Sequence, residues 1–174
     1  MTLSNKFSNT DIWKGIILFG LNAATYKMAL AKTLLDFSQQ GKLTITWNEL
    51  SEAFLDQYIL RLGTNTMPQQ GNPKRLTVME RVVKELQLEI ITRTKAVEIV
   101  AEKGLENVVP RFQTIGRNAL AINDYFYTIN YGHSIVLKDT ILSISKLESI
   151  ELEKELMARW SLLEGAFTIN QQQF

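Results

Sequence analysis

The chain has 174 residues, of which 45% are hydrophobic and 21% are charged, and it contains no cysteine. This composition is typical of a globular domain that can bury a full core, and the lack of cysteine excludes a disulfide framework or a thiolate metal site and favours the cytosol. The formal net charge of only +1 excludes a polybasic nucleic-acid binder as a description of the whole chain.

The basic residues are not spread evenly along the chain. Residues 61–117 hold ten Lys/Arg and six Asp/Glu, a local charge of +4, whereas residues 118–174 carry −3. A basic middle suits contact with phosphate, but such an imbalance is more often a solvated face, so both interpretations stay open. The most apolar stretch, residues 15–24, is about half as long as a bilayer requires, and we interpret it as a buried helix rather than a membrane span.

The first predicted helix spans residues 11–40 and is apolar on two sides. One stripe runs from Trp13 through Gly20 and Ala24, and a second stripe lies beside it, a pattern typical of the central helix of a domain. Gly20 and Ala24 are four residues apart, which predicts that a neighbouring backbone approaches closely. Replacing Gly20 with leucine is therefore expected to overpack this contact.

The sequence predicts a second helix and a loop after residue 40. Thr46 and Glu49 form a capping box, in which each side chain bonds to the backbone of the other residue, and this predicts a second helix over residues 47–62. Residues 64–75 are rich in Gly, Pro, Asn and Gln and are predicted to form a loop. A loop of this length without structure of its own is usually functional or mobile.

The remaining predicted elements are mostly helical. A third helix starts at the capping box of Thr77 and Glu80. After it the sequence predicts a helix from Thr92 to near Gly104, an irregular segment over 108–118, a β-hairpin over 126–137, a short helix capped by Asp139 and a last helix over 146–169. The expected fold class is mainly α: one helical domain over residues 1–174, built around a long central helix, with a small β-hairpin.

No set of side chains in the sequence makes a complete catalytic or metal site. His133 is the single histidine and follows a glycine in the predicted hairpin turn, so we expect it to be an exposed turn residue. A zinc site needs three or four convergent ligands, which one histidine without cysteine does not supply. We therefore expect no cofactor and no DNA cleavage by this chain, and assign no catalytic and no metal-binding residue.

The loop over residues 64–75 and the helix after it carry the best candidates for contact with nucleic acid. Amide side chains can bond to base edges, and Lys and Arg pair with phosphate. The candidates are Gln69, Gln70, Asn72, Lys74, Arg75, Arg81 and Lys84, with Arg111 and Arg117 as a second group beside Phe112, an aromatic residue that could stack on a base. Ordinary connecting loops use the same residue types, so that interpretation stays open as well.

Four segments spread over nearly the whole chain resemble the amino-terminal region of a bacterial HNH-endonuclease family. They are residues 13–27 (WKGIILFGLNAATYK), 67–80 (MPQQGNPKRLTVME), 109–112 (VPRF) and 158–166 (ARWSLLEGA). The resemblance implies a helical leader to a following HNH module, in which histidines and a divalent metal cut DNA. It transfers no catalytic residue to this chain, which has one histidine and no cysteine.

Two functions remain as hypotheses. The first is a non-catalytic helical domain that positions or oligomerises an HNH-type DNA endonuclease in bacterial restriction or defence. The alternative is a small accessory subunit of a multiprotein defence complex that makes no direct contact with DNA. The expected partners are DNA, a nuclease module or partner subunit, and further copies of the chain, but no membrane.

Overall fold

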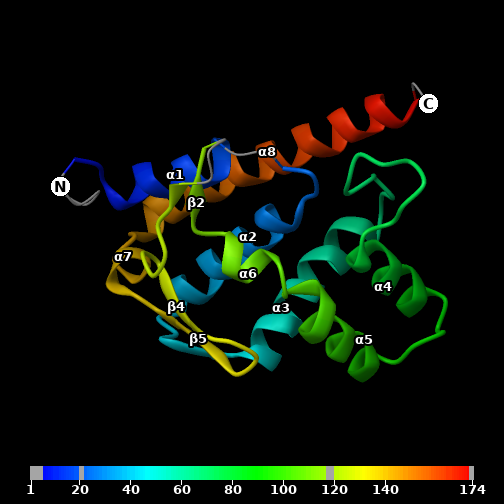
Figure 1. Ribbon diagram of the computed structural model, residues 1–174, viewed down its shortest axis with the longest axis horizontal. Helices are drawn as coiled ribbons and strands as arrows, with labels where there is room; N and C mark the ends of the chain where they lie inside the picture. Colours follow the sequence, from blue (N-terminus) through cyan, green and yellow to red (C-terminus); the bar gives the residue numbers. More distant parts are fainter. Residues whose placement is uncertain (1–5, 20–21, 117–119, 173–174) are drawn as a thin grey trace.

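The computed structural model describes residues 6–19, 22–116 and 120–172. Helices dominate this part of the chain, which confirms the mainly α class (Figure 1). The helices are α1 (Asn9–Leu18), α2 (Tyr26–Gln39), α3 (Trp47–Leu62), α4 (Val78–Gln87), α5 (Arg93–Ile99), α6 (Val108–Arg111), α7 (Asp139–Leu142) and α8 (Lys146–Gln172), and the π-helix η2 (Val100–Gly104) continues α5. The strands are β1 (Thr44–Thr46), β2 (Thr114–Ile115), β3 (Leu120–Ala121), β4 (Tyr127–Asn130) and β5 (Ser134–Leu137).

Capping boxes fix the starts of α3 and α4 where the sequence predicts them. The Thr46 side chain accepts a hydrogen bond from the backbone of Glu49, whose carboxylate accepts one from the backbone of Thr46. Thr77 and Glu80 make the same reciprocal pair at the start of α4. Each box satisfies backbone N–H groups that the first turn of a helix leaves without partners, which is why both helices begin at these residues.

The prediction of one helix over residues 11–40 is wrong, because this stretch forms the separate helices α1 and α2, and the described residues between them, 19 and 22–25, are not helical. The backbone just before α2 pairs with the loop after α3: Thr25 donates its N–H to the carbonyl of Gln69 at 3.0 Å, and Ala24 forms an isolated bridge with Gln70. These bonds replace the ones that a continuous helix would make. Gly20, for which a close backbone contact was predicted, lies outside the described residues.

The central role that was predicted for the whole stretch belongs to α2. Eight of its 14 residues are buried, and they lie on several sides of the helix. In Figure 1, α2 lies beneath α8, and α1 runs alongside α8. Because α8 is one unbroken helix of 27 residues, it joins the two ends of the molecule along one side. No helix in the described ranges is long and apolar enough to cross a lipid bilayer.

A small antiparallel sheet covers one end of the helices. The strands β4 and β5 pair across residues 131–133, within the range where a hairpin was predicted. The sheet gains β1 as a third strand, in the order β1-β5-β4, with Ile45 opposite Ile135. The sequence did not indicate β1, because its three residues are too short to show an alternating pattern. The pair β2–β3 likewise begins in a segment that was predicted to be irregular.

We expect the substitution Gly104→Val to lower the free energy of unfolding by about 1–3 kcal/mol, as overpacking of a filled core does. Gly104 is buried at the end of η2, and a Cβ atom there would lie 3.1 Å from Met79 Sδ and 3.2 Å from Val100 Cγ1. The measurement is urea denaturation. Gly165→Ala is the matched control: it adds a Cβ inside α8 with no atom within 4 Å, and it should stabilise the helix by about 0.5–1 kcal/mol. Equal midpoints for the two variants would contradict this packing.

Candidate nucleic-acid interface

Four of the predicted basic residues line one surface hollow. Lys74 and Arg75 come from the end of the loop after α3, and Arg81 and Lys84 come from the first two turns of α4. The hollow has a volume of about 480 Å³, and we call it the basic groove. The structure therefore brings together the residues that the local sequence pattern selected.

Local structure explains why these four side chains point outward. The capping box at Thr77 fixes the first turn of α4, and the helix buries Met79, Val82 and Val83 against the core. Arg81 and Lys84 lie on the opposite side of the helix and are exposed, as are Lys74 and Arg75. The amphipathic character of α4 thus places its cations at the surface.

The charge of the basic groove is largely uncompensated. Glu85 is the one acidic residue among the described residues that line it. In the ranges that the structure describes, no ion pair joins Lys74, Arg75, Arg81 or Lys84 to a carboxylate, whereas seven other Lys and Arg side chains do form such pairs. Clustered cations without counter-charges create a positive potential that attracts phosphate.

Two of the predicted amide residues shape the loop. Gln70 is half-buried, and its Nε2 donates to the carbonyl oxygens of Asn72, at 2.5 Å, and of Arg75. Asn72 is exposed, and its Oδ1 accepts the backbone N–H of Lys74 at 2.9 Å. The loop also contacts the end of α8, because the carbonyl oxygen of Gln70 accepts a bond from Gln171 at 3.0 Å. These bonds hold the backbone that carries Lys74 and Arg75.

Gln69, predicted to contact nucleic acid, is fully buried, so it cannot reach a base edge. The second group of candidates, Arg111 and Arg117 beside Phe112, does not form a common site in the described residues either. Arg111 is exposed at the end of α6 but does not line the basic groove. Phe112, proposed as a stacking surface, is fully buried, and its ring lies 5.6 Å from that of Trp13 in the core. Arg117 lies outside the described residues.

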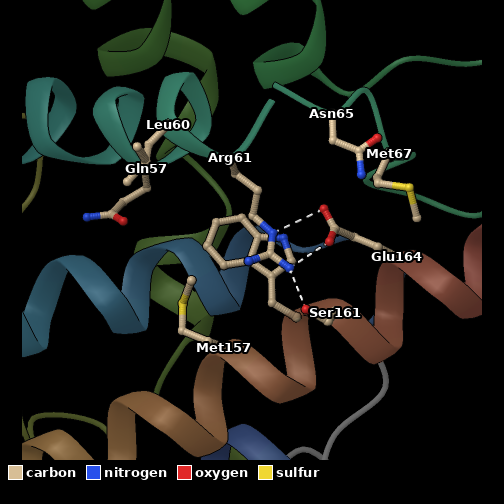
Figure 2. Close-up of a pocket in the computed structure, with 9 residues that line it drawn as sticks. Gln57, Leu60, Arg61, Asn65, Met67, Met157, Ser161 and Glu164 are labelled. Atoms are coloured by element: carbon tan, nitrogen blue, oxygen red, sulfur yellow. Dashed lines mark hydrogen bonds and ion pairs between the residues drawn. The ribbon is translucent and has the colours of Figure 1, made fainter. Parts of the chain in front are cut away.

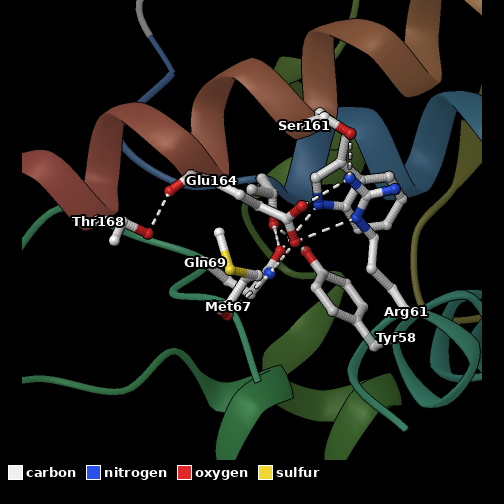
Figure 3. Close-up of polar contacts among 9 residues, drawn as sticks. Tyr58, Arg61, Met67, Gln69, Ser161, Glu164 and Thr168 are labelled. Carbon is white, nitrogen blue, oxygen red and sulfur yellow. Dashed lines mark hydrogen bonds and ion pairs between the residues drawn. The ribbon is translucent and has the colours of Figure 1, made fainter. Parts of the chain in front are cut away.

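Gln69 is instead the centre of a buried polar network (Figure 3). Its Oε1 accepts bonds from Thr25 Oγ1, at 2.6 Å, and from Trp160 Nε1, at 2.8 Å. Its Nε2 donates to the carboxylate of Glu164 at 2.5 Å. Its backbone N–H donates to Glu80 at 3.0 Å. One loop residue therefore joins α2, α4 and α8.

Tyr58 of α3 extends the network on its buried side. The Thr25 hydroxyl uses its single proton in the bond to Gln69, so the Tyr58 hydroxyl must donate to Thr25, at an O–O distance of 2.9 Å. Burial raises the pKa of Tyr58 well above its usual range, which keeps this donor protonated. The described partners thus satisfy the polar atoms at this point of the core.

An ion pair closes the outer side of the network (Figure 2). Arg61 of α3 donates to Glu164 of α8 through Nη2, at 2.6 Å, and through Nε, at 3.1 Å. Its guanidinium carbon lies 4.5 Å from the centroid of the Trp160 ring, a cation–π contact. Both charged side chains are largely buried, with exposed fractions of 15% for Arg61 and 7% for Glu164.

The sequence analysis missed this network, although a signal for part of it was present. Trp160 and Glu164 are four residues apart on α8, so they share a helix face. A tryptophan is usually largely buried, and a carboxylate on the same helix face implies a buried partner. The identity of the partners, Arg61 and Gln69, depends on contacts across about a hundred residues of chain.

Among the residues that the structure describes, no three His, Cys, Asp or Glu side chains gather in a way that would hold a metal ion. His133 lies exposed in the turn between β4 and β5. Comparison with family models, with curated proteins and with solved structures finds no match to this chain. The proposals for its function therefore depend on the basic groove and the polar network.

Proposed function

We propose that the chain is a non-catalytic helical domain that holds an HNH-type DNA endonuclease on DNA, with the basic groove as the contact to the phosphate backbone. The observation that carries the DNA contact is the set of four exposed cations in one hollow, none of them paired with a carboxylate in the described ranges. The link to a nuclease rests on the four sequence segments that resemble the HNH family. On this proposal the domain acts in the bacterial cytosol, in restriction or defence.

The charge in the basic groove comes from side chains and not from the amino end of α4. Glu80 places its carboxylate there and accepts the backbone N–H groups of Thr77, at 2.6 Å, and of Gln69, at 3.0 Å. A carboxylate at this position takes the place that an anion would occupy at a free helix terminus. We therefore infer contact through Lys and Arg alone, which positions DNA without reading its sequence.

The double substitution Lys74→Ala/Arg75→Ala is expected to weaken duplex binding about equally for all sequences. Loss of two phosphate contacts should lower the slope of log K against log salt by about 2. The measurement is a salt titration with a fluorescently labelled duplex of 20 base pairs. Lys138→Ala/Lys146→Ala is the matched control, because it removes the same charge at two exposed positions outside the basic groove.

Three results would contradict the proposal. If wild type does not bind the duplex at low salt, the groove is not a DNA contact. If the control lowers the slope as much as the groove variant does, binding is diffuse and the groove has no special role. An unchanged slope for the groove variant beside tight wild-type binding would place the contact elsewhere.

A second candidate function, the accessory subunit without DNA contact, is favoured by the apolar residues of the same groove. Leu76, Leu88 and Ile90 line it with exposed fractions of 50%, 61% and 65%. Apolar side chains surrounded by cations suit an acidic, amphipathic protein surface, such as the acidic last helix of another copy. On this candidate, sedimentation would show self-association that is lost in Leu88→Gln/Ile90→Gln, and wild type would not bind DNA.

A further inference from the structure

A second hollow lies between α3 and α8 (Figure 2). It has a volume of about 360 Å³, within the range of about 300–1,000 Å³ that is usual for small-ligand sites. Asn65 and Met67, from the start of the loop, line one end of it, and Gln57 of α3 lines the other end. We call it the amide hollow. It shares no lining residue with the basic groove.

The wall of the amide hollow carries no net charge. Arg61 and Glu164 are its only ionisable lining residues among those described, and they neutralise each other in a two-bond ion pair. The other polar groups are the amides of Gln57 and Asn65 and the hydroxyl of Ser161. A neutral wall gives no advantage to phosphate or carboxylate, and it favours an uncharged ligand that forms hydrogen bonds.

One wall of the hollow is planar and rigidly held. The Arg61 guanidinium lies against the fully buried Trp160 ring, and it is fixed by two bonds to Glu164 and by one from Nη2 to Ser161 Oγ at 3.0 Å. A guanidinium plane with a fixed orientation is a surface on which nucleobases stack. Arg61 and Trp160 both line the hollow, and because the indole is fully buried we expect a ligand to meet the guanidinium.

The edges of the hollow suit a heterocycle as well. The Asn65 side chain is exposed and, in the described ranges, forms no recorded hydrogen bond, so both its donor and its acceptor are available. An amide of this kind can pair with a ring nitrogen and an exocyclic group of a base. Met67 and Met157 line opposite sides, and thioether side chains adapt to the edge of an aromatic ring.

We propose that the amide hollow binds a nucleobase or a similar uncharged planar heterocycle, stacked on Arg61 and paired with Asn65. This ligand chemistry has two sources, an unpaired base within a nucleic-acid strand and a free nucleoside. The inference goes beyond the proposed function, because the basic groove contacts phosphate, whereas the amide hollow would contact a base. If the base belongs to a strand, the loop over residues 64–75 contributes to both contacts, because its first residues line the amide hollow and its last residues line the basic groove.

The test follows the Nε1–H resonance of Trp160 by NMR, with three probes: the free nucleosides, a single strand of five nucleotides, and the same strand made entirely of abasic sites. We expect the nucleosides or the normal strand to shift this resonance and the abasic strand to leave it unchanged. Two variants separate stacking from pairing. Arg61→Lys keeps the charge and loses the plane, and Asn65→Ala removes the pairing group at an exposed position.

Each variant should weaken base binding about tenfold, the low end of what stacking or a bidentate amide contributes. A shift with the strand alone assigns the site to an unpaired base, and a shift with free nucleosides assigns it to a small ligand. The proposal is overturned if the Trp160 resonance stays unchanged with every base-containing probe. It is also overturned if Asn65→Ala and a folded Arg61→Lys both bind the probes with wild-type affinity. Lys74→Ala/Arg75→Ala should leave nucleoside binding unchanged, so failure here is distinct from failure of the basic groove.

Discussion

Replacing Gln69 with leucine is expected to lower the free energy of unfolding by about 3–5 kcal/mol. Leucine has a similar size but removes both ends of the amide, so Thr25, Trp160 and Glu164 each lose a partner inside the core. Each buried polar group left without a partner costs about 1–3 kcal/mol, and more when it is charged. We expect a cost below the sum of these three contributions, because the loop can relax and admit water.

The measurement is urea denaturation, with Gln87→Leu as the matched control. Gln87 is exposed on α4, and the same exchange there breaks no recorded bond of a described residue. The control should stay within about 0.5 kcal/mol of wild type, as surface substitutions do. A Gln69→Leu protein that unfolds at the midpoint of the control would show that the network does not hold the loop.

The substitution Glu164→Leu is expected to cost about 3–5 kcal/mol, because it leaves the Arg61 charge largely buried and unpaired. Arg61→Met should also lower the free energy of unfolding, because it leaves the carboxylate of Glu164 buried without its charged partner. The double variant Arg61→Met/Glu164→Leu should cost clearly less than the sum of the two, because it removes both charges together. Full recovery is not expected, since Gln69 Nε2 then loses the carboxylate of Glu164 and keeps only the carbonyl oxygen of Met67, at 3.1 Å, as an acceptor.

A double-mutant cycle measured by urea denaturation tests this coupling. The coupling energy should exceed about 1 kcal/mol, as is usual for residues in one hydrogen-bonded network. Strictly additive effects would mean that the pair acts as two independent surface charges, contrary to its burial.

Local signals in the sequence were sufficient where a feature depends on neighbours within one turn. The capping boxes at Thr46 and Thr77 predicted two helix starts, and four basic candidates that lie close together in the sequence, Lys74, Arg75, Arg81 and Lys84, line one groove. Features that depend on distant contacts were not predictable in this way. The connection after α1 pairs with Gln69 and Gln70, more than forty residues further along the chain.

The burial of Gln69 was not predictable from the local sequence either. An amide in a loop rich in Gly and Pro is usually exposed, and nothing beside it in the sequence indicates otherwise. The side chains that its amide bonds, those of Thr25, Trp160 and Glu164, lie 44, 91 and 95 residues away. Phe112 was misassigned for a related reason, because an aromatic residue beside an arginine fits either a binding surface or a core until its packing against Trp13 is known.

Contact between the basic groove and DNA can be measured directly by NMR. The experiment follows the chemical shift of each arginine Nε–H when a duplex of 12 base pairs is added at low salt. We expect shifts for Arg75 and Arg81, which are exposed in the groove, and none for the largely buried Arg61. Arg111, which is exposed outside the groove, should not shift either. Shifts at Arg111 with Arg75 and Arg81 unchanged would contradict a DNA contact in the groove.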